Sequence, residues 1–139
     1  MALLEADRIR NIALVGHGGS GKTSLAEALL FKTGMTNRLG SVPDGTSFLD
    51  STEEAKAKLS SIDSALCHLV HQGLHVNLLD TPGTPAFCGP AFAALAAVEC
   101  AAIVVSASAG IQVNTRRMFE QAREYGIGVW VAVNHIDAA

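Results

Sequence analysis

The sequence has 139 residues, of which 49% are hydrophobic and 17% are charged, and its formal net charge is −3. A chain of this length and composition fits one domain with a single buried core, so we expect one domain over residues 1–139. The acidic balance excludes a broad basic surface for nucleic acid. We therefore expect no DNA binding, and any RNA contact would be local or lie outside this chain.

The cysteines and the apolar segments bear on the compartment. Cys67, Cys88 and Cys100 lack the close spacing of a zinc site or a disulfide framework, which favours the reducing cytoplasm. The first ten residues have no long apolar core and do not resemble a signal peptide. Residues 91–110 have about the length of a membrane span, but Glu99 lies within them and their valine-rich half is typical of a strand. We expect no membrane segment.

Short apolar runs alternate with helical patterns along the chain, which is typical of a mostly parallel α/β sheet. The first predicted elements are a buried strand at residues 10–16, a glycine-rich loop and a helix that starts at Lys22 and ends near Gly34. Residues 35–61 are rich in glycine, proline and small polar residues, so we expect an irregular segment with a short helix at residues 51–59. Long irregular segments inside compact domains are commonly functional.

The second half continues with a hairpin that turns near Gln72 and Gly73 and whose second strand ends at Asp80. The elements predicted after it alternate between helix and strand, at residues 90–99, 100–107, 112–126 and 127–134. Three arginines of the last helix are predicted to face solvent: Arg116, Arg117 and Arg123. Three large apolar residues are predicted to belong to the core: Met118, Phe119 and Trp130.

Residues 16–23 satisfy the pattern G-x-x-x-x-G-K-[ST] between a predicted strand and a predicted helix. Glycines let backbone N–H groups converge on phosphate oxygens, and the helix N-terminus adds partial positive charge. Lys22 would reach the β- and γ-phosphates, and Thr23 would supply a hydroxyl to Mg²⁺. The predicted phosphate-binding residues are Gly16, His17, Gly18, Gly19, Ser20, Gly21, Lys22, Thr23 and Ser24.

A second motif, Asp-Thr-Pro-Gly, begins at the end of the second hairpin strand. The Asp80 carboxylate can hold Mg²⁺ directly or through water, and the Gly83 N–H can meet a γ-phosphate. Such a tetrapeptide on its own could be an ordinary turn. Its place after a phosphate-binding loop and at the end of a strand favours a functional role.

A third motif, Asn134-His135-Ile136-Asp137, follows the last predicted strand, at the edge where ligands bind in open α/β sheets. The Asp137 carboxylate can accept hydrogen bonds from the N1–H and the exocyclic amino group of guanine. Adenine offers neither donor at those positions. The motif therefore predicts a site that selects guanine over adenine.

Three histidines, His68, His71 and His75, could be considered as metal ligands. Residues three apart on an extended strand point to opposite faces, so His68 and His71 could not share a metal without distortion. We expect them to be solvated residues of the hairpin.

The three motifs, in this order and spacing, resemble the GTP-binding domain of translational GTPases, in particular elongation factor G and its bacterial paralogues. The segments "EALLFKTG" and "GIQVNTRRMFEQAREYGIGVWVAVNHID" are similar to that branch, and the resemblance runs from Ile9 to Asp137. It implies a three-layer P-loop NTPase fold with a mostly parallel sheet, one antiparallel edge hairpin and helices on both faces. It also implies GTP and GDP as ligands, Mg²⁺ as cofactor, GTP hydrolysis, and the ribosome as partner of the full-length protein.

The chain departs from this family's pattern at several site positions. Counting back without gaps places residues 58–61 where the family has R-G-I-T, so Ser61 takes the place of a threonine that closes over Mg²⁺, and a one-residue slip nominates Ser60 instead. Gly19 stands in place of an aspartate, and His135 in place of a lysine. The resemblance thus implies Thr23, Ser61 and Asp80 as metal ligands and Asn134, His135 and Asp137 as base-binding residues.

Thr84 stands where family members use histidine to position the attacking water. The loss of a water-orienting group lowers the rate and leaves binding largely intact. The residues implied in hydrolysis are Lys22, Gly83 and Thr84, with slow turnover in the absence of the ribosome. Two alternatives stay open: a GTP-binding switch with little or no hydrolysis, and an ATP-using P-loop enzyme, against which Asn134 and Asp137 argue.

The chain ends two residues after Asp137, whereas the family fold continues through a sixth strand, a last helix and an S-A-[KL] loop that helps to hold guanine. The resemblance therefore implies a GTP-binding domain truncated after N-x-x-D, from the front of a larger factor. A sheet that ends early exposes an unpaired edge and an apolar face, so we expect self-association.

Overall fold

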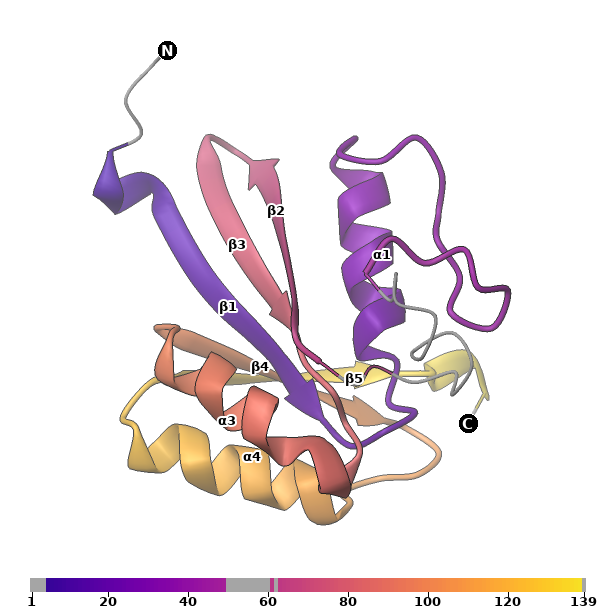
Figure 1. Ribbon diagram of the computed structural model, residues 1–139, viewed down its shortest axis with the longest axis vertical. Coiled ribbons are helices and arrows are strands. Elements are labelled where there is room, and N and C mark those ends of the chain that lie inside the picture. The colour runs from indigo at the N-terminus through magenta and orange to yellow at the C-terminus, as the bar shows by residue number, and fades with distance from the viewer. Residues whose placement is uncertain (1–4, 50–60, 62, 139) are drawn as a thin grey trace.

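The computed structural model describes residues 5–49, 61 and 63–138 (Figure 1). The strands are β1 (Ile9–Gly16), β2 (Ala65–His71), β3 (Leu74–Asp80), β4 (Cys100–Ser106) and β5 (Gly128–Asn134). The helices are α1 (Lys22–Lys32), α3 (Cys88–Ala96) and α4 (Val113–Glu124), with short 3-10 turns at Ala6–Arg8, Pro85–Phe87 and Ile136–Ala138. The predicted order of strands and helices is confirmed. The short helix predicted at residues 51–59 lies outside the described residues.

The five strands form one sheet in the order β2-β3-β1-β4-β5. Strands β1, β3, β4 and β5 run parallel, and the hairpin strand β2 pairs antiparallel with β3. Within the part of the chain described, this is the mostly parallel sheet with one antiparallel edge hairpin that the resemblance implies.

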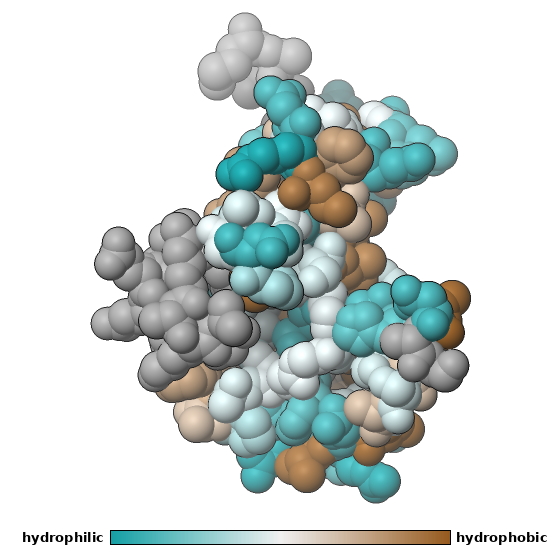
Figure 2. Space-filling view, turned by 90° about the vertical axis from the view of Figure 1, so that its right-hand side faces the viewer, coloured by the Kyte–Doolittle hydropathy of each residue, from teal (hydrophilic) through white to brown (hydrophobic). Residues whose placement is uncertain are grey.

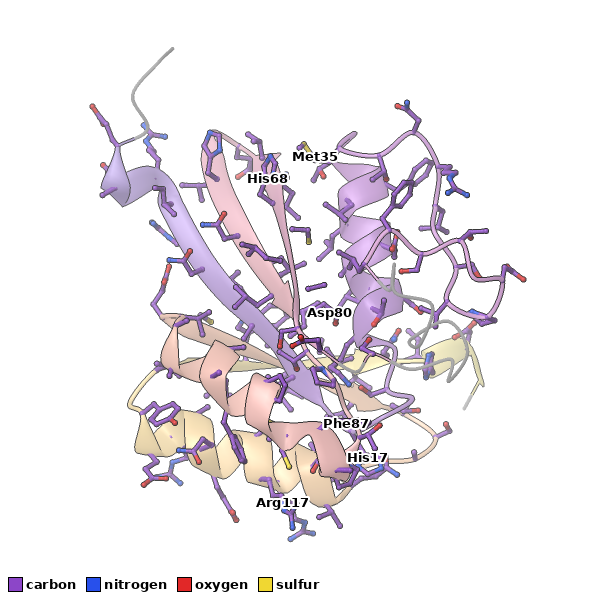
Figure 3. All side chains as sticks on the ribbon, viewed as in Figure 1. His17, Met35, His68, Asp80, Phe87 and Arg117 are labelled. Atoms are coloured by element: carbon purple, nitrogen blue, oxygen red, sulfur yellow. The ribbon has the colours of Figure 1, made fainter. Side chains whose placement is uncertain are left out.

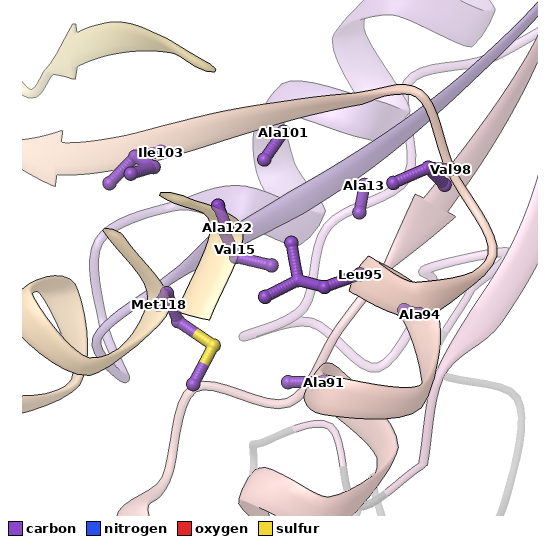
Figure 4. Close-up of a cluster of buried hydrophobic side chains, with 10 residues drawn as sticks. All are labelled: Ala13, Val15, Ala91, Ala94, Leu95, Val98, Ala101, Ile103, Met118 and Ala122. Atoms are coloured by element: carbon purple, nitrogen blue, oxygen red, sulfur yellow. The ribbon is translucent and has the colours of Figure 1, made fainter. Parts of the chain in front are cut away.

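Helices cover both faces of the sheet (Figure 1). Helix α1 packs on one face, where Ala26 meets Leu14 and Val104 in a first cluster of buried residues. Helices α3 and α4 pack on the other face, where Leu95 and Met118 belong to a second cluster (Figure 4). Because the chain after β1 goes to one face and the chain after β3 goes to the other, the carboxyl ends of these neighbouring strands open a crevice, where open α/β sheets bind ligands.

The sequence of α1 accounts for its bounds. Lys22, Ala26 and Leu30 are buried and lie one turn apart, so they form the face that meets the sheet. The helix ends before Gly34, which has a φ of +75°, and the Met35 N–H donates to the Leu30 carbonyl at 2.9 Å. This left-handed glycine is a common way to end a helix, and it confirms the end predicted from the sequence.

Helix α3 starts at Cys88 and ends at Ala96, earlier at both ends than the predicted range of 90–99. Pro90 is tolerated in the first turn because the N–H groups there have no partner within the helix. The chain leaves the helix at Ala97 so that Val98, 7% exposed, reaches the core before β4 begins.

Helix α4 buries Met118 and exposes all three of its arginines, as predicted; Figure 3 shows Arg117 pointing away from the helix. The core prediction for Phe119 is wrong, since its side chain is 42% exposed. One residue along a helix turns the side chain by about 100°, which takes Phe119 off the buried face. The Arg123 guanidinium instead lies 5.9 Å from the centre of its ring.

The core prediction for Trp130 is also wrong, because Trp130 is 44% exposed. It lies on β5, which is an edge strand of the described sheet. Its neighbours Val131 and Val133 are 56% and 60% exposed, so apolar residues on both sides of this strand reach solvent. An edge strand has a neighbouring strand on one side only, so its side chains are less covered than those of a central strand. The sequence pattern of a strand does not reveal whether that strand lies at the edge.

The β2–β3 hairpin turns at Gln72 and Gly73, both with positive φ, as two-residue hairpin turns of the mirror-image type require. His68 and His71 are exposed on β2 and His75 is half-buried on β3. Figure 2 shows hydrophobic residues as separate patches among hydrophilic ones on the face that it presents. Within residues 5–49, 61 and 63–138, no helix combines the length and the apolar character needed to cross a membrane.

Candidate functional site

The loop between β1 and α1 depends on glycine. Gly16, Gly19 and Gly21 have φ values of +145°, +77° and +86°, which residues other than glycine rarely adopt. Gly16 also abuts the Val104 carbonyl, with which a Cβ would overlap. The loop therefore takes a tight course that turns directly into the N-terminus of α1.

Lys22 is the first residue of α1 and is only 6% exposed. Its Nζ donates to the Gly16 carbonyl at 3.3 Å and to the His17 carbonyl at 2.9 Å, so the side chain folds back over the loop. Burial lowers the pKa of Lys22 from 10.5 to about 8, and the nearby Asp80 carboxylate opposes part of that shift. An anionic ligand beside the Lys22 amine would favour its charged form and raise this pKa again.

Asp80 ends β3 and is 1% exposed (Figure 3). The Thr23 hydroxyl donates to Asp80 Oδ2 at 2.6 Å, and Thr23 Oγ1 lies 3.3 Å from Ser61 Oγ. Of the two serines nominated from the sequence, the structure brings Ser61 to this cluster, and Ser60 lies outside the described residues. Two hydroxyls and a carboxylate are hard oxygen donors of the kind that Mg²⁺ prefers, so the residues present fit that ion.

The Asp-Thr-Pro-Gly turn lies against the glycine-rich loop. The Thr81 hydroxyl donates to the Leu14 carbonyl at 2.7 Å, which ties the turn to β1. Gly83 is buried, and a Cβ on it would overlap Lys22 Nζ and would lie 2.6 Å from Gly18 N. The carbonyl of Gly83 accepts a 2.7 Å hydrogen bond from Asn114 Nδ2. A side chain at position 83 would thus push the two loops apart.

A cavity of about 230 Å³ lies between these loops. Its walls include ten of the residues predicted from the sequence: Gly18, Gly19, Gly21, Lys22, Thr23, Ser24, Ser61, Gly83, Thr84 and His135. Gly16 and Asp80, at the ends of β1 and β3, and His17 and Ser20, in the glycine-rich loop, are not among the residues that line the cavity.

Only part of the N-x-x-D motif contacts the glycine-rich loop. Asn134 Nδ2 donates to the Ser20 carbonyl at 3.1 Å, and His135 Nδ1 lies 3.4 Å from Ser106 Oγ. Both side chains lie against Gly21, where a Cβ would overlap the Asn134 amide. Asp137 is exposed in the turn Ile136–Ala138 and is not among the residues that line the cavity.

Sequence reasoning missed four residues that the structure places at the site: Val42, Pro43, Thr81 and Asn114. Thr81 could have been found from its place inside the Asp-Thr-Pro-Gly motif. Val42 and Pro43 lie in the irregular segment that was expected to be functional, but nothing in the local pattern singled them out. Asn114 reaches Gly83 across 31 positions of sequence, and no sequence signal indicated that contact.

A family model, described as the elongation factor Tu GTP binding domain, matches residues 7–139. The chain belongs to this family. The assignment made from the three motifs is thereby confirmed, and so is the fold that the resemblance implied.

Relatives of this GTP binding domain chain include translation factors and resistance proteins. An elongation factor G-like protein of Mycobacterium tuberculosis is 37% identical over 94% of this chain and 18% of its own length. An oxytetracycline resistance protein of Streptomyces rimosus is 41% identical over 91% of this chain and 19% of its own length. The chain spans about a fifth of the length of these relatives.

Two solved structures share the fold of this chain. A crystal structure of a Thermus thermophilus protein superposes with a TM-score of 0.93 at 44% identity, covering 95% of this chain and 20% of that one. A bacterial selenocysteine-specific elongation factor superposes with a TM-score of 0.73 at 22% identity, covering 94% of this chain and 20% of its own, which shows a shared fold.

Proposed function

We propose that residues 1–139 form one GTP-binding domain, which binds GTP and GDP with Mg²⁺ and hydrolyses GTP to GDP and phosphate as part of a translation factor acting on the ribosome. The observation that carries this proposal is the convergence of Lys22, Thr23 and Gly83 on one cavity between the glycine-rich loop and the Asp-Thr-Pro-Gly turn. Each residue brings a group suited to a different part of a triphosphate.

The phosphates would lie along the glycine-rich loop. Backbone N–H groups at the start of α1 and the Lys22 ammonium provide positive charge where the phosphate oxygens would lie. Gly83 also lines the cavity, and its backbone N–H would meet only the third phosphate. This division of labour supports Lys22 as a residue for both nucleotides and Gly83 as a residue that distinguishes GTP from GDP.

Magnesium would be held by the oxygen cluster of Thr23, Ser61 and Asp80. When bound, the ion neutralises charge on the phosphates and helps to orient them. The protein's part is to hold the three oxygen donors at the junction of α1, the segment before β2 and the end of β3.

Guanine would be recognised by the N-x-x-D motif. Asn134 braces the glycine-rich loop through the Ser20 carbonyl, and His135 lies over Gly21, where its ring can cover the base. Asp137 can accept hydrogen bonds from guanine because it is exposed beside this region. Since adenine lacks the matching donors, this motif supports GTP over ATP.

Thr84 lines the cavity directly after Gly83. A threonine side chain is shorter than the imidazole that water-positioning histidines use, so hydrolysis by this protein would be slow without the ribosome. The same residue favours a second candidate function, a GTP-responsive switch that binds both nucleotides and hydrolyses GTP little. Gly19, which leaves open space next to the cavity, points in the same direction.

The ribosome as partner and the cytoplasm as compartment are proposed from the names of the relatives. The names of the relatives are those of elongation factor G, elongation factor G-like proteins and tetracycline resistance proteins. A factor of that kind works where ribosomes are, so we place this protein in the cytoplasm. Because the chain spans about a fifth of those relatives, the activity belongs to the whole protein.

One titration tests the proposal. Protein containing residues 1–139 is titrated with GTP, GDP and ATP in Mg²⁺, and Lys22→Ala is compared with Lys32→Ala, which changes an exposed lysine on the same helix. We expect ATP to bind about a hundredfold or more weakly than GTP. We also expect only Lys22→Ala to weaken GTP and GDP binding. Equal affinity for ATP, or unchanged GDP binding in Lys22→Ala, would contradict the proposal.

A further inference from the structure

Asn114 lies in the first turn of α4 and is not among the residues that line the cavity. The residue is 1% exposed, and its Nδ2 donates a 2.7 Å hydrogen bond to the Gly83 carbonyl. This bond ties the turn to α4, since Gly83 and Asn114 are 31 residues apart in the sequence.

The other side of Gly83 is closed by the glycine-rich loop. A Cβ on Gly83 would overlap Lys22 Nζ and would come within 2.6 Å of Gly18 N and 2.7 Å of the His17 carbonyl carbon. A Cβ on Gly18 would in turn lie 3.7 Å from both the carbon and the oxygen of the Gly83 carbonyl. The Cα of Gly83 is thus packed closely against the glycine-rich loop, and its carbonyl is held by Asn114.

The amide of Asn114 is only half satisfied. Its Oδ1 is buried and has no hydrogen-bond partner among the residues that the structure describes. A buried acceptor without a partner costs about as much as one hydrogen bond contributes, so this side chain adds little net stability. Its remaining effect is directional, because it fixes the orientation of the Gly83 carbonyl. All peptide bonds described are trans, so the Thr84 N–H points away from Asn114.

We infer that Asn114 is a positioning residue that holds Gly83 in place to receive the third phosphate and thereby sets the preference of the site for GTP over GDP. The inference rests on the proposed function, in which the Gly83 N–H contacts only the γ-phosphate. Without the hydrogen bond to Asn114, residue 83 is no longer tied to α4, so Gly83 as a whole can shift and take its N–H away from that contact. GDP has no γ-phosphate, so its binding depends on the glycine-rich loop and is left unchanged.

The test compares two variants with a control in the full-length protein. Asn114→Ala removes the whole side chain beyond Cβ, and Asn114→Leu fills a similar volume without a buried polar group. Asn77→Ala serves as the matched control, because Asn77 Nδ2 also donates one side-chain hydrogen bond, to Asn11 Oδ1 at 2.8 Å, and is not among the residues lining the cavity. Dissociation constants for a non-hydrolysable GTP analogue and for GDP are measured for each.

We expect both Asn114 variants to bind the GTP analogue about five- to tenfold more weakly, the range for one neutral hydrogen bond, with GDP affinity within about twofold of the parent. Asn77→Ala keeps the parent ratio. A GTP-to-GDP ratio unchanged in Asn114→Leu, or an equal loss for both nucleotides, overturns the inference while leaving the proposed function intact. If the parent itself binds neither nucleotide, the proposed function is wrong and this inference falls with it.

Discussion

The Thr23 hydroxyl donates a 2.6 Å hydrogen bond to the Asp80 carboxylate and so joins the first turn of α1 to the end of β3. The two residues are 57 positions apart, yet each belongs to a motif that was assigned separately. The register of the sheet explains the meeting. Asp80 pairs with Leu14 in β1, and the chain leaves β1 two residues later for the loop that leads into α1, of which Thr23 is the second residue.

Removal of this hydroxyl tests the magnesium site. In Thr23→Ala the Asp80 carboxylate remains but one oxygen donor is lost, so we expect Mg²⁺ to slow GDP release much less than in the parent, by about tenfold or more. Thr23→Ser keeps the hydroxyl and is the matched control. GDP release is followed with a fluorescent nucleotide across a Mg²⁺ titration. Identical Mg²⁺ dependence in Thr23→Ala and the parent would exclude Thr23 as a ligand.

The buried ammonium of Lys22 predicts a dependence of stability on pH in the nucleotide-free protein. Its pKa is about 8 when folded and 10.5 when unfolded, so above pH 8 the unfolded chain binds more protons than the folded one. The free energy of unfolding therefore rises with pH, and Lys22 adds about 1 kcal/mol between pH 7 and pH 9.

Lys22→Met isolates this effect. The variant lacks the titrating group. We therefore expect the free energy of unfolding of Lys22→Met minus that of the parent to fall by about 1 kcal/mol as pH rises from 7 to 9. Urea unfolding at three pH values gives that difference, and contributions from other groups cancel in it. A difference that does not depend on pH would mean that the Lys22 ammonium is not desolvated.

Glu27 supports the outer wall of the cavity from within α1. It is fully buried, and its Oε1 accepts hydrogen bonds from Ser47 Oγ at 2.7 Å and from the Phe48 and Leu49 N–H groups at 2.6 and 3.2 Å. These bonds anchor the segment whose preceding residues, at positions 42 and 43, line the cavity.

Glu27→Gln removes the charge that these donors face. We expect it to lower the free energy of unfolding by about 1–3 kcal/mol, because hydrogen bonds to a charged acceptor are stronger than those to an amide. Glu120→Gln, at an exposed position of α4, is the control and is expected to stay within about 0.5 kcal/mol of the parent. Urea unfolding measures both variants. A Glu27→Gln variant as stable as the parent would show that the carboxylate charge is not needed there.

The parts of the site that could be predicted from the sequence are those whose chemistry is local. Gly16, Gly19 and Gly21 need backbone conformations that few residues adopt, and Lys22 follows them at a fixed spacing, so the glycine-rich loop can be predicted from the sequence. Strand and helix order was readable for the same reason, because hydrophobic period and turn residues are local properties.

The parts that were not predicted depend on packing between distant elements. Asn114 is an ordinary polar residue within a helical pattern until α4 packs beside the end of β3, and only then does its amide face Gly83. Phe119 and Trp130 were assigned to the core on their apolar character, but the helix face and the edge strand on which they lie are set by the whole sheet. Apolar character does not say how much of a surface is covered.

In the proposed function Asp137 selects the base, and its side chain is exposed in the turn Ile136–Ala138. In Asp137→Asn the side chain can donate as well as accept, so we expect xanthine nucleotides to gain affinity relative to GTP. Asp44→Asn changes an exposed aspartate elsewhere and is the control. Competition between GTP and XTP for the site gives the ratio. A ratio that matches the parent in Asp137→Asn would mean that Asp137 does not contact the base.

Thr84 tests whether this protein is a hydrolase or mainly a switch. It lines the cavity next to Gly83, so in the proposed function a side chain at this position lies near the third phosphate. In Thr84→His the longer imidazole can orient water where the threonine hydroxyl falls short. We expect ribosome-dependent hydrolysis by the full-length protein to rise about tenfold, with GTP affinity nearly unchanged. A positioned acid or base commonly contributes ~10² to 10⁴, but residues that act together are not additive, and Gly19 and Ser61 also depart from the family pattern.

Single-turnover hydrolysis with saturating ribosomes measures the effect in the parent, in Thr84→His and in Thr84→Ala. The alanine variant shows whether the threonine hydroxyl contributes at all, and we expect its rate to equal that of the parent. A gain in Thr84→His alone would mean that the phosphate and magnesium groups are competent and that water positioning limits the rate. If Thr84→Ala hydrolyses GTP more slowly than the parent and Thr84→His no faster, then threonine itself positions the water. That result would contradict our interpretation of this residue.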